Sequence, residues 1–372
     1  MRFVISTSTV CVMSAVLAFA CGGGDDQTAF SPDAAIDGGA IGDAISDSSL
    51  SDSSLLLPDG APLSPGARNW AEFPSISQVD GATEIWAVSD VHGDYAALTK
   101  LFAGAGIVAS APATPAAAVW NQGTAVLVVV GDLIDKGPDA PDVVRFMIAL
   151  QASAAAAGGK VVVTMGNHEA EFLADPNNSK ASGAAGVDSE LVAIGLTPDA
   201  TAAGDDDIGV FIRNLPIAAR IDDWFFVHAG KTGGLSISAL ASAIQSGVDT
   251  SGFGATVLAA DDSLLEARLN ASSPQWWDAT NDPAGLLASW SSAVGARHLV
   301  MGHQPGAVGF TSGPNRKNDQ MFAAYGGALF LIDTGLSVGV DATGGALLHV
   351  KNAGTATVSW EEILPDGSKK SL

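Results

Sequence analysis

Cysteine is almost absent from this 372-residue sequence, which contains only Cys11 and Cys21. Cys11 lies in an apolar N-terminal segment that we expect to be removed, so the mature chain would keep at most Cys21 and form no internal disulfide. Cysteine therefore plays no part in the catalysis or the fold that we expect for this chain.

Positive charge is also scarce, because 17 Lys and Arg stand against 40 Asp and Glu and give a formal net charge of −23. Such a chain lacks the basic surface that offsets phosphate repulsion, so nucleic acid is not an expected partner. Part of the imbalance is local, since residues 22–67 contain eight Asp and no Lys, Arg or Glu. This stretch is expected to be a solvated, self-repelling spacer.

The sequence has no apolar run long enough for a comfortable membrane span, since Val10 to Ala20 is shorter than the roughly 20 residues required. Ala18-Phe19-Ala20 is an A-x-A cleavage pattern directly before Cys21, so residues 1–20 are predicted to be an export signal. Two outcomes remain open: secretion of a soluble protein, or lipidation of Cys21 as in bacterial lipoproteins. The long tether favours the lipid anchor, and we expect a periplasmic, outer-membrane or cell-surface monomer, with secretion as the alternative.

After the signal, the sequence divides into a polar linker and an apolar body. Residues 21–80 are rich in Asp, Ser, Gly, Ala and Pro and are expected to form a disordered acidic tether. Residues 81–372 are expected to form one domain, in which early strands alternate with helices and indicate an α/β fold. The strand-rich end predicts a second sheet packed on the first, which gives a two-sheet β-sandwich flanked by helices.

The expected strands are residues 84–89, 124–130, 160–164, 216–221, 224–227, 297–301, 328–332, 346–350 and 357–360. Helices are predicted over 95–105 and 141–157. Residues 174–212 and 231–285 are expected to form surface helices and loops.

Five of these strands are followed at once by residue types that bind metals. SDVHGD, GDLIDKG and GNHE follow the first three strands, and HAG and GHQ follow two later ones. Because ligands of α/β sheets bind beyond the carboxyl ends of the strands, we expect these turns to converge in one cleft. The side chains that would meet there are Asp90, His92, Asp132, Asn167, His228 and His303.

This set of donors indicates two transition-metal ions. Carboxylates, imidazoles and one amide oxygen suit Mn, Fe or Zn better than an all-oxygen Ca site. Asp90 and His92 are two residues apart, so both can face one cation on an extended segment. Asp132 has two oxygens and can bridge two cations roughly 4 Å apart, which would clamp the attacking and leaving oxygens of a phosphoryl group.

A single motif of this kind is usually structural, and only the joint occurrence of several motifs carries the prediction. The chain has six His, and four of them lie in the strand-end motifs, including His168 next to Asn167. The other two, His298 and His349, lie within strand patterns and are expected to be structural.

The motifs DVHGD, GDLIDKG, GNHE, VHAG and GHQ occur in the order found in the calcineurin-like metallophosphoesterase superfamily, which the chain resembles over about residues 82–340. LPIAARIDDWFFVHAG is similar to the segment before the HGG motif of the phosphoprotein-phosphatase branch. Pro305 stands where many phosphodiesterases of the superfamily have a second His. IDTGLSVGVDATGGAL resembles the bacterial-type, Shewanella-like subgroup. The resemblance implies that residues 81–372 are a catalytic domain with the family's αββα fold.

The resemblance also implies a role for each site residue. The implied ligands are Asp90, His92 and Asp132 for the first metal, and Asp132, Asn167, His228 and His303 for the second. His168 matches the family's proton donor to the leaving oxygen, and Asp135 would hold its ring in the donating form. Lys136 and Asn167 would contact the substrate phosphate.

Three departures from the family's pattern bear on the substrate. Lys136 stands where this branch usually has Arg, and it offers a point charge instead of a bidentate fork. Ala229 replaces the first Gly of HGG. Asp278 follows Trp277 in SPQWWDA, where protein-phosphatase relatives would have an Arg. Other basic residues could compensate, although a structural role is favoured for each: Arg213, Arg220, Lys231 and Arg316.

We therefore expect an enzyme that hydrolyses phosphate monoesters, of a small molecule or a phosphoprotein, through a metal-bridging hydroxide. Two alternatives remain open. One is an enzyme that cleaves phosphodiesters or dinucleoside polyphosphates, and the other is a surface lipoprotein that only binds metal or a phosphorylated ligand. His168 and Asp135 favour catalysis, because pure binding needs no proton donor.

Overall fold

The computed structural model describes residues 68–372. The expected signal segment, Cys21 and most of the expected linker lie outside these residues. None of the helices formed by residues 68–372 combines the length and the apolar character needed to cross a membrane.

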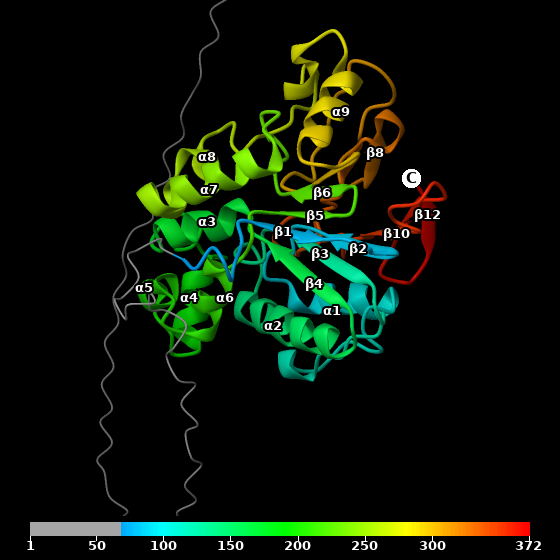
Figure 1. The fold of residues 1–372 in the computed structure, drawn as a ribbon. Helices are drawn as coiled ribbons and strands as arrows, with labels where there is room; N and C mark the ends of the chain where they lie inside the picture. Colours follow the sequence, from blue (N-terminus) through cyan, green and yellow to red (C-terminus); the bar gives the residue numbers. More distant parts are fainter. Residues whose placement is uncertain (1–67) are drawn as a thin grey trace, which may run out of the picture. The chain divides into compact units, whose positions relative to one another are not determined.

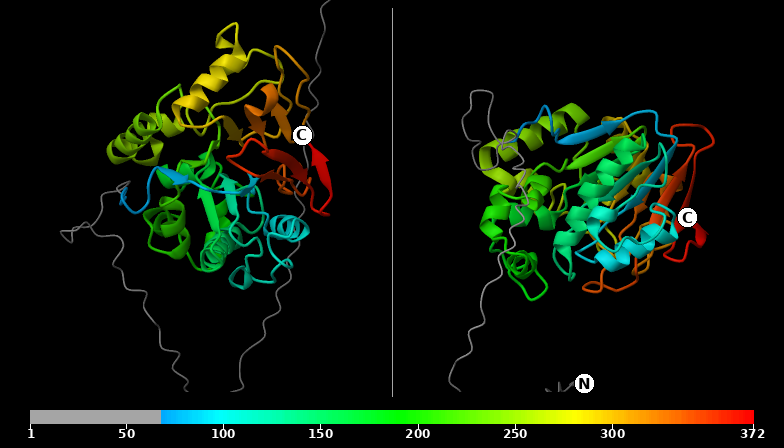
Figure 2. Two further views of the ribbon diagram at one scale, coloured as in Figure 1. Left: turned by 45° about the vertical axis from the view of Figure 1, so that its right-hand side comes forward. Right: turned by 90° about the horizontal axis from the view of Figure 1, so that it is seen from below.

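Two six-stranded sheets pack against each other (Figure 2). The first sheet contains, in spatial order, β1 (Ile76–Val79), β5 (Ala218–Ile221), β6 (Trp224–Val227), β7 (His298–Met301), β9 (Leu329–Leu331) and β8 (Phe322–Ala324). The second contains β12 (Lys369–Ser371), β11 (Ser359–Ile363), β10 (Leu347–Lys351), β2 (Glu84–Val88), β3 (Val126–Val130) and β4 (Lys160–Thr164). Helices flank this pair of sheets, so the expected two-sheet α/β sandwich is confirmed.

Helices α1 and α2 lie against the sheet that contains β2, β3 and β4, and α9 lies on the side of the other sheet (Figure 1). The α-helices are α1 (Tyr95–Gly104), α2 (Ala140–Ala156), α3 (Asn167–Ala174), α4 (Val187–Ala193), α5 (Pro198–Ala203), α6 (Asp207–Arg213), α7 (Ile237–Ser251), α8 (Thr256–Ala259) and α9 (Pro283–Ala293). Short 3₁₀ turns are η1 (Pro115–Ala117), η2 (Gly252–Gly254), η3 (Trp276–Ala279) and η4 (Tyr325–Gly327).

The strand β3 shows why the apolar runs of this sequence form buried strands. Val126, Val128 and Val130 pack between the two sheets, whereas Leu127 and Val129 pack against the helices on the outer face. Successive side chains of a strand point to opposite faces, so a strand covered on both sides is apolar at every position. In the first sheet, β6 and β9 follow the same rule. Every expected strand overlaps an observed one.

The ordered domain begins earlier than the expected boundary at residue 81. Ile76–Val79 form β1, which pairs in parallel with β5. The buried guanidinium of Arg68 donates hydrogen bonds to the carbonyl oxygens of Phe73 and of residues 213–215, where α6 ends. Burial and the neighbouring Arg213 lower the pKa of Arg68 to about 9. A cation at the carboxyl end of a helix is favourable, so residues 68–80 belong to the fold and not to the linker.

The direction of the strands gathers the metal-binding motifs at one edge of the sandwich. β2, β3 and β4 run parallel in the second sheet, and β6, β7 and β9 run parallel in the first. The turns after β2 and β3 continue side by side beyond the sheet, since His92 N donates to Asp132 O at 2.8 Å and Gly93 N to Leu133 O at 2.7 Å.

A buried carboxylate fixes the turn after β3 to the start of α3. Both oxygens of Glu169 accept backbone hydrogen bonds, from Asp132 N (3.0 Å), Leu133 N (2.7 Å), Ile134 N (3.1 Å) and Gly166 N (2.8 Å). Burial and the charge of Asp132 raise the pKa of Glu169 to about 7, while the amides that bond it act in the opposite direction. Glu169 thus accepts the hydrogen bonds that a neighbouring strand would otherwise accept from these four amides.

Replacing Glu169 by Ala is expected to destabilise the domain by roughly 3 kcal/mol or more, because four buried amides lose their acceptor. Glu169→Gln should cost less, since one carbonyl oxygen remains. Glu171→Ala, which removes a partly exposed carboxylate of the same helix, should cost at most about 1 kcal/mol. Urea unfolding followed by tryptophan fluorescence measures all three. Equal losses for Glu169→Ala and Glu171→Ala would contradict the assigned role.

Candidate metal centre

The strand-end turns bring all the predicted ligands to one place. Asp90 and His92 follow β2, Asp132 follows β3, and Asn167 opens α3 directly after β4. His228 and His303 come from the other sheet, after β6 and β7. Each of these six side chains is buried, as are those of Asp135 and His168. The structure therefore assembles the set that the motifs predicted.

One group of donors, which we call the second donor group, surrounds Nε2 of His228. This nitrogen lies 3.1 Å from Asn167 Oδ1, 3.1 Å from His303 Nδ1 and 3.3 Å from Asp132 Oδ1. Donors that bind one transition metal at about 2.1 Å lie roughly 3 to 3.5 Å from one another. The spacing of this group fits a single cation.

The other group, which we call the first donor group, consists of Asp90, His92 and Asp132 and lies on the other side of Asp132. His92 Nε2 is 3.5 Å from Asp132 Oδ2 and 4.0 Å from Asp90 Oδ1. Donor atoms of His92, Asp132 and His168 also lie within 4.8 Å of one another. Asp132 therefore turns Oδ1 to one group and Oδ2 to the other.

An unpaired oxygen supports the fit of a cation. Asp90 Oδ2 accepts a hydrogen bond from His303 N at 2.9 Å, but Oδ1 is buried without a hydrogen-bond partner among residues 68–372. A buried polar atom in this state costs about 1 to 3 kcal/mol. A cation held by Asp90, His92 and Asp132 would remove that cost, so the residues present fit a metal pair.

The negative charges of the buried carboxylates Asp90 and Asp132 require a positive charge nearby. Burial raises the pKa of Asp90, whereas for Asp132 burial is outweighed by His228 and His168, which hold its pKa well below the usual range. Burial would lower the pKa of His228, but Asp132 and Asp90 raise it to about 10. The proton that the carboxylates hold on His228 is the charge that a bound cation would replace.

The other two imidazoles among the predicted ligands, those of His92 and His303, remain neutral. Burial lowers the pKa of His92 to about 3, against the effect of Asp132. Burial and the charge of His228 lower the pKa of His303 to about 2. A neutral imidazole has a free lone pair, which is the form that binds metals.

The backbone of these turns has left-handed conformations that non-glycine residues rarely adopt. Six of the eleven such residues in the range 68–372 belong to the centre: Asp90, His92, Asp132, Asp135, Lys136 and His303, with φ between 46° and 72°. Each costs about 1 to 3 kcal/mol and persists only where surrounding contacts enforce it. Close approach also requires glycine, since a Cβ at Gly166 would collide with Asp132 Oδ1.

His168 is oriented by a carboxylate. Its Nδ1 lies 2.7 Å from Asp135 Oδ2, and Asp135 Oδ1 accepts a hydrogen bond from Val187 N at 2.9 Å. The remaining ring nitrogen, Nε2, lies 3.9 Å from Asp132 Oδ2 at the edge of the centre. This arrangement suits the delivery of a proton from Nε2.

Lys136 lies beside the first donor group, with Nζ 3.2 Å from His92 Nε2. Its turn is held on two sides, because Lys136 N donates to Ala185 O at 2.6 Å and Ser337 Oγ donates to Lys136 O at 3.2 Å. A Cβ at Gly339 would collide with Lys136 O, so the loop after β9 closes directly over this turn.

The other basic residues considered from the sequence are bonded elsewhere. Arg213 donates to Ala202 O (2.7 Å), Arg220 pairs with Asp80 (2.9 Å), Lys231 pairs with Asp262 (3.0 Å), and Arg316 donates to the carbonyl oxygens of Gln304, Gly306, Gln320 and Asp333. Asp278 accepts hydrogen bonds from Gln275 N (2.7 Å) and Thr311 Oγ1 (2.9 Å) and thereby caps η3. The favoured structural roles agree with these contacts.

Sequence reasoning missed two parts of the surroundings. Glu169 lies within GNHE, but its four backbone partners are not visible in a motif. Leu264 and Leu269 hydrogen-bond to Ala229 and Gln304, the neighbours of His228 and His303, although their stretch was expected to form surface helices and loops.

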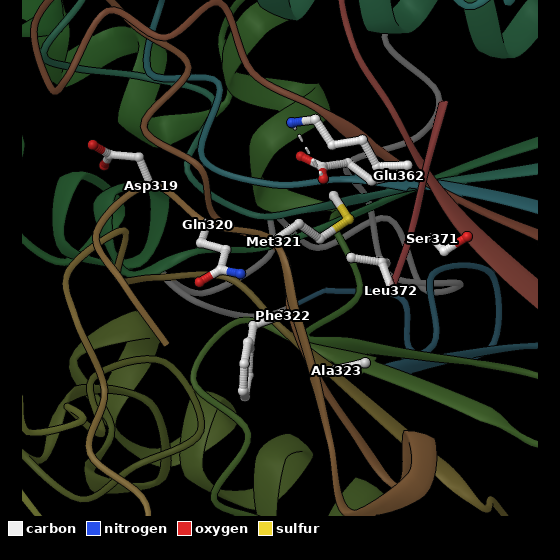
Figure 3. A pocket seen from close by; sticks show the side chains of 9 residues that line it. Asp319, Gln320, Met321, Phe322, Ala323, Glu362, Ser371 and Leu372 are labelled. Carbon is white, nitrogen blue, oxygen red and sulfur yellow. Dashed lines mark ion pairs between the residues drawn. The ribbon is translucent and has the colours of Figure 1, made fainter. Parts of the chain in front are cut away.

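A pocket of about 390 Å³ opens near the C-terminus, between the edge strands β8 and β12, and contains none of the predicted site residues (Figure 3). It is lined by Asp319, Gln320, Met321, Phe322, Ala323, Glu362, Lys370, Ser371 and Leu372. Lys370 pairs at 3.7 Å with Glu362, its partner on the adjacent strand β11, along one wall of the pocket (Figure 3). The pocket is therefore separate from the metal centre.

Comparison with solved structures shows which proteins share this fold. A cold-active protein tyrosine phosphatase superposes with a TM-score of 0.60 at 20% identity, over 82% of this chain and 84% of that chain. The cold-active protein-tyrosine phosphatase of a psychrophilic Shewanella species gives 0.58 at 21% identity, over 80% and 82%. A protein serine/threonine phosphatase of Saccharomyces cerevisiae gives 0.51 at 14% identity, over 80% and 89%. At these identities the likeness establishes the fold.

Curated relatives match a shorter region. An uncharacterized protein of Schizosaccharomyces pombe is 38% identical over 87 residues, which are 23% of this chain and 25% of the relative. Shewanella-like protein phosphatase 2 of Arabidopsis thaliana is 34% identical over 83 residues, which are 22% and 20%. The chain thus spans a quarter or less of the length of these relatives.

The profile of the family described as calcineurin-like phosphoesterase matches residues 83–327, which is more than half of the chain. This range contains every predicted ligand. The match to Shewanella-like protein phosphatase 2 over 83 residues supports the resemblance to the bacterial-type branch. The chain therefore belongs to the calcineurin-like phosphoesterase family.

Proposed function

We propose that the protein is a two-metal phosphatase that hydrolyses phosphate monoesters with Mn, Fe or Zn. The observation that carries this proposal is the position of Asp132, whose two oxygens lie 3.3 Å from His228 Nε2 and 3.5 Å from His92 Nε2. One carboxylate shared between two groups of donors is the arrangement that a metal pair requires. The similar proteins include named phosphatases, which supports a phosphorylated substrate, either a small molecule or a phosphoprotein.

Two bound metals would supply an activated water and offset the charge of the phosphate oxygens. Side chains of the protein itself would transfer the proton and bind the phosphate. Asp135 holds Nδ1–H of His168, so Nε2 is the atom that passes a proton to the leaving oxygen. Lys136, whose Nζ lies 3.2 Å from His92 Nε2, would contact a phosphate oxygen from that side, and Asn167 would hold a metal and also contact the substrate.

Replacing Asp132 by Asn is expected to lower the hydrolysis of p-nitrophenyl phosphate at least about 100-fold, because the bridge between the donor groups loses its charge. The metal content per chain, measured by mass spectrometry of the purified protein, should fall with it. Asp262→Asn, which changes an exposed carboxylate paired with Lys231, should leave both values unchanged. Near-wild-type activity of Asp132→Asn would remove the proposed mechanism.

His168→Asn is expected to slow poor leaving groups most, because an alkyl alcohol needs a proton in the transition state and p-nitrophenolate does not. The loss should reach about 100-fold or more for an alkyl phosphate and be much smaller for p-nitrophenyl phosphate. His298→Asn, in which the changed ring stacks on Trp224 away from the centre, is the matched control. A uniform loss across leaving groups would contradict a proton-donor role.

Two substrate tests separate the alternatives. Faster turnover of bis-p-nitrophenyl phosphate than of the monoester would favour a phosphodiesterase. Tight phosphate binding without turnover of any ester, with Mn, Fe and Zn each supplied, would favour a protein that only binds. The hydrogen bond between His168 and Asp135 supports catalysis over binding alone.

We also propose that the protein is exported and anchored through a lipid on Cys21, on the basis of the pattern Ala18-Phe19-Ala20-Cys21. The purified mature protein is expected to begin at Cys21 and to carry the mass of attached acyl chains. Cys21→Ala should release the protein from the membrane fraction into the soluble fraction. A mature chain that still begins at Met1 would contradict export, and an unmodified Cys21 would contradict the anchor.

A further inference from the structure

The turn of Asp135 and Lys136 has a strained backbone, because both residues adopt the left-handed conformation, with φ of 62° and 59°. Non-glycine residues stay in this conformation only where surrounding contacts enforce it. The side chain of Asp135 is fixed by His168 and by Val187 N. At Lys136, the enforcing contacts are made by the backbone.

The peptide groups before and after Lys136 are each held by a hydrogen bond. Lys136 N donates to Ala185 O at 2.6 Å, and Lys136 O accepts from Ser337 Oγ at 3.2 Å. Because each peptide group is planar, fixing both of them sets the φ and ψ of the residue between them. The direction in which the side chain of Lys136 leaves the backbone therefore depends on Ser337.

Ser337 lies in the loop between β9 and β10, residues 332–346, and its side chain is fully buried. Its carbonyl oxygen accepts a hydrogen bond from Val340 N at 3.0 Å, and its hydroxyl accepts one from Gly339 N at 3.2 Å. A hydroxyl has one proton to donate besides its acceptor positions. With Gly339 N as its donor, the hydroxyl of Ser337 directs its own proton to Lys136 O.

The loop between β9 and β10 is also fixed to the start of α1. Val338 N donates to Asp94 Oδ2 at 2.9 Å, and Asp94 Oδ1 accepts from Ala97 N at 2.9 Å in the first turn of that helix. A Cβ at Gly339 would lie 1.4 Å from Lys136 O, so only glycine permits this close approach. The two residues that follow Ser337 thus hold the loop against the turn of Lys136.

We propose that Ser337 is a positioning residue for Lys136. Lys136 Nζ lies 3.2 Å from His92 Nε2, beside the first donor group, which is the position from which it would contact the substrate phosphate. The hydroxyl of Ser337 holds the strained turn, and the turn keeps the ammonium in that position. Ser337 acts through Lys136 and contributes no ligand to the centre. This inference rests on the proposed phosphatase function and names a residue of another loop that serves it.

Isothermal titration calorimetry of the Mn-loaded protein with inorganic phosphate gives the Kd, and kinetics with an alkyl phosphate give KM and kcat. Lys136→Ala is expected to raise the phosphate Kd about 10- to 100-fold, because a charged hydrogen bond is lost. Ser337→Ala should raise the Kd and KM about 3- to 10-fold and leave kcat and the metal content unchanged, since the ammonium remains but is no longer held in place.

A double variant separates positioning from a general loss of stability. If Ser337 acts through Lys136, adding Ser337→Ala to Lys136→Ala should change the phosphate Kd no further, because the side chain that it positions is already gone. Ser153→Ala is the matched control, since it removes a serine hydroxyl of α2 that accepts a hydrogen bond from Trp120 N at 2.9 Å. This control should lower the thermal unfolding midpoint about as much as Ser337→Ala and leave the phosphate Kd unchanged.

A phosphate Kd within about twofold of wild type in Ser337→Ala would overturn the inference, and so would additive effects of the two substitutions in the double variant. An unchanged Kd in Lys136→Ala would overturn it as well, because no phosphate contact would be left to position. In each of these cases, turnover by the wild-type protein would leave the proposed function intact. Absence of turnover in the wild type, with phosphate binding that depends on Lys136 and Ser337 as one unit, would refute the phosphatase and support the positioning role.

Discussion

The carboxylate of Asp132 is only 2% exposed, and a charge buried to this degree must be compensated by its surroundings. Compensation comes from His228, whose Nε2 lies 3.3 Å from Asp132 Oδ1, and from the backbone N–H of His168, which donates to Asp132 Oδ1 at 3.1 Å from the first turn of α3. Glu169 holds the turn that carries Asp132, and Gly166 leaves room for it. The sheets, the start of α3 and the turns are all arranged around this one carboxylate.

Most of the fold follows from local sequence. A strand buried on both faces must be apolar throughout, so β3 and β4 are recognisable as runs of Val. The strands β1, β8 and β12 were not predicted, because each is short and, unlike the equally short β6, β7 and β9, is not buried at every position. The start of the domain was placed too late for a similar reason. Arg68 is fixed by carbonyl groups about 145 positions away, and no local pattern reveals such a contact.

The centre was more predictable than its surroundings. Its donors stand immediately after strands, so a pattern in the sequence becomes proximity in space. His298 and His349 were expected to be structural, and they stack on Trp224 and Trp86 at ring distances of 4.0 and 3.6 Å. The position of residues 264–269 beside the centre could not be predicted, because it depends on hydrogen bonds to Gln304 and Ala229 and on no pattern within these residues.

The hydrogen bond from His303 N to Asp90 Oδ2 joins residues 213 positions apart. Closing so long a loop costs chain entropy that only a nearly complete set of native contacts repays. During synthesis, a nascent chain that stops before β7 contains the three residues of the first donor group but not the last ligand of the second. If the centre holds the proposed metal pair, full occupancy of both positions would be reached only by a molecule that has finished folding, and the metal content of a preparation would then report its fraction of native chains.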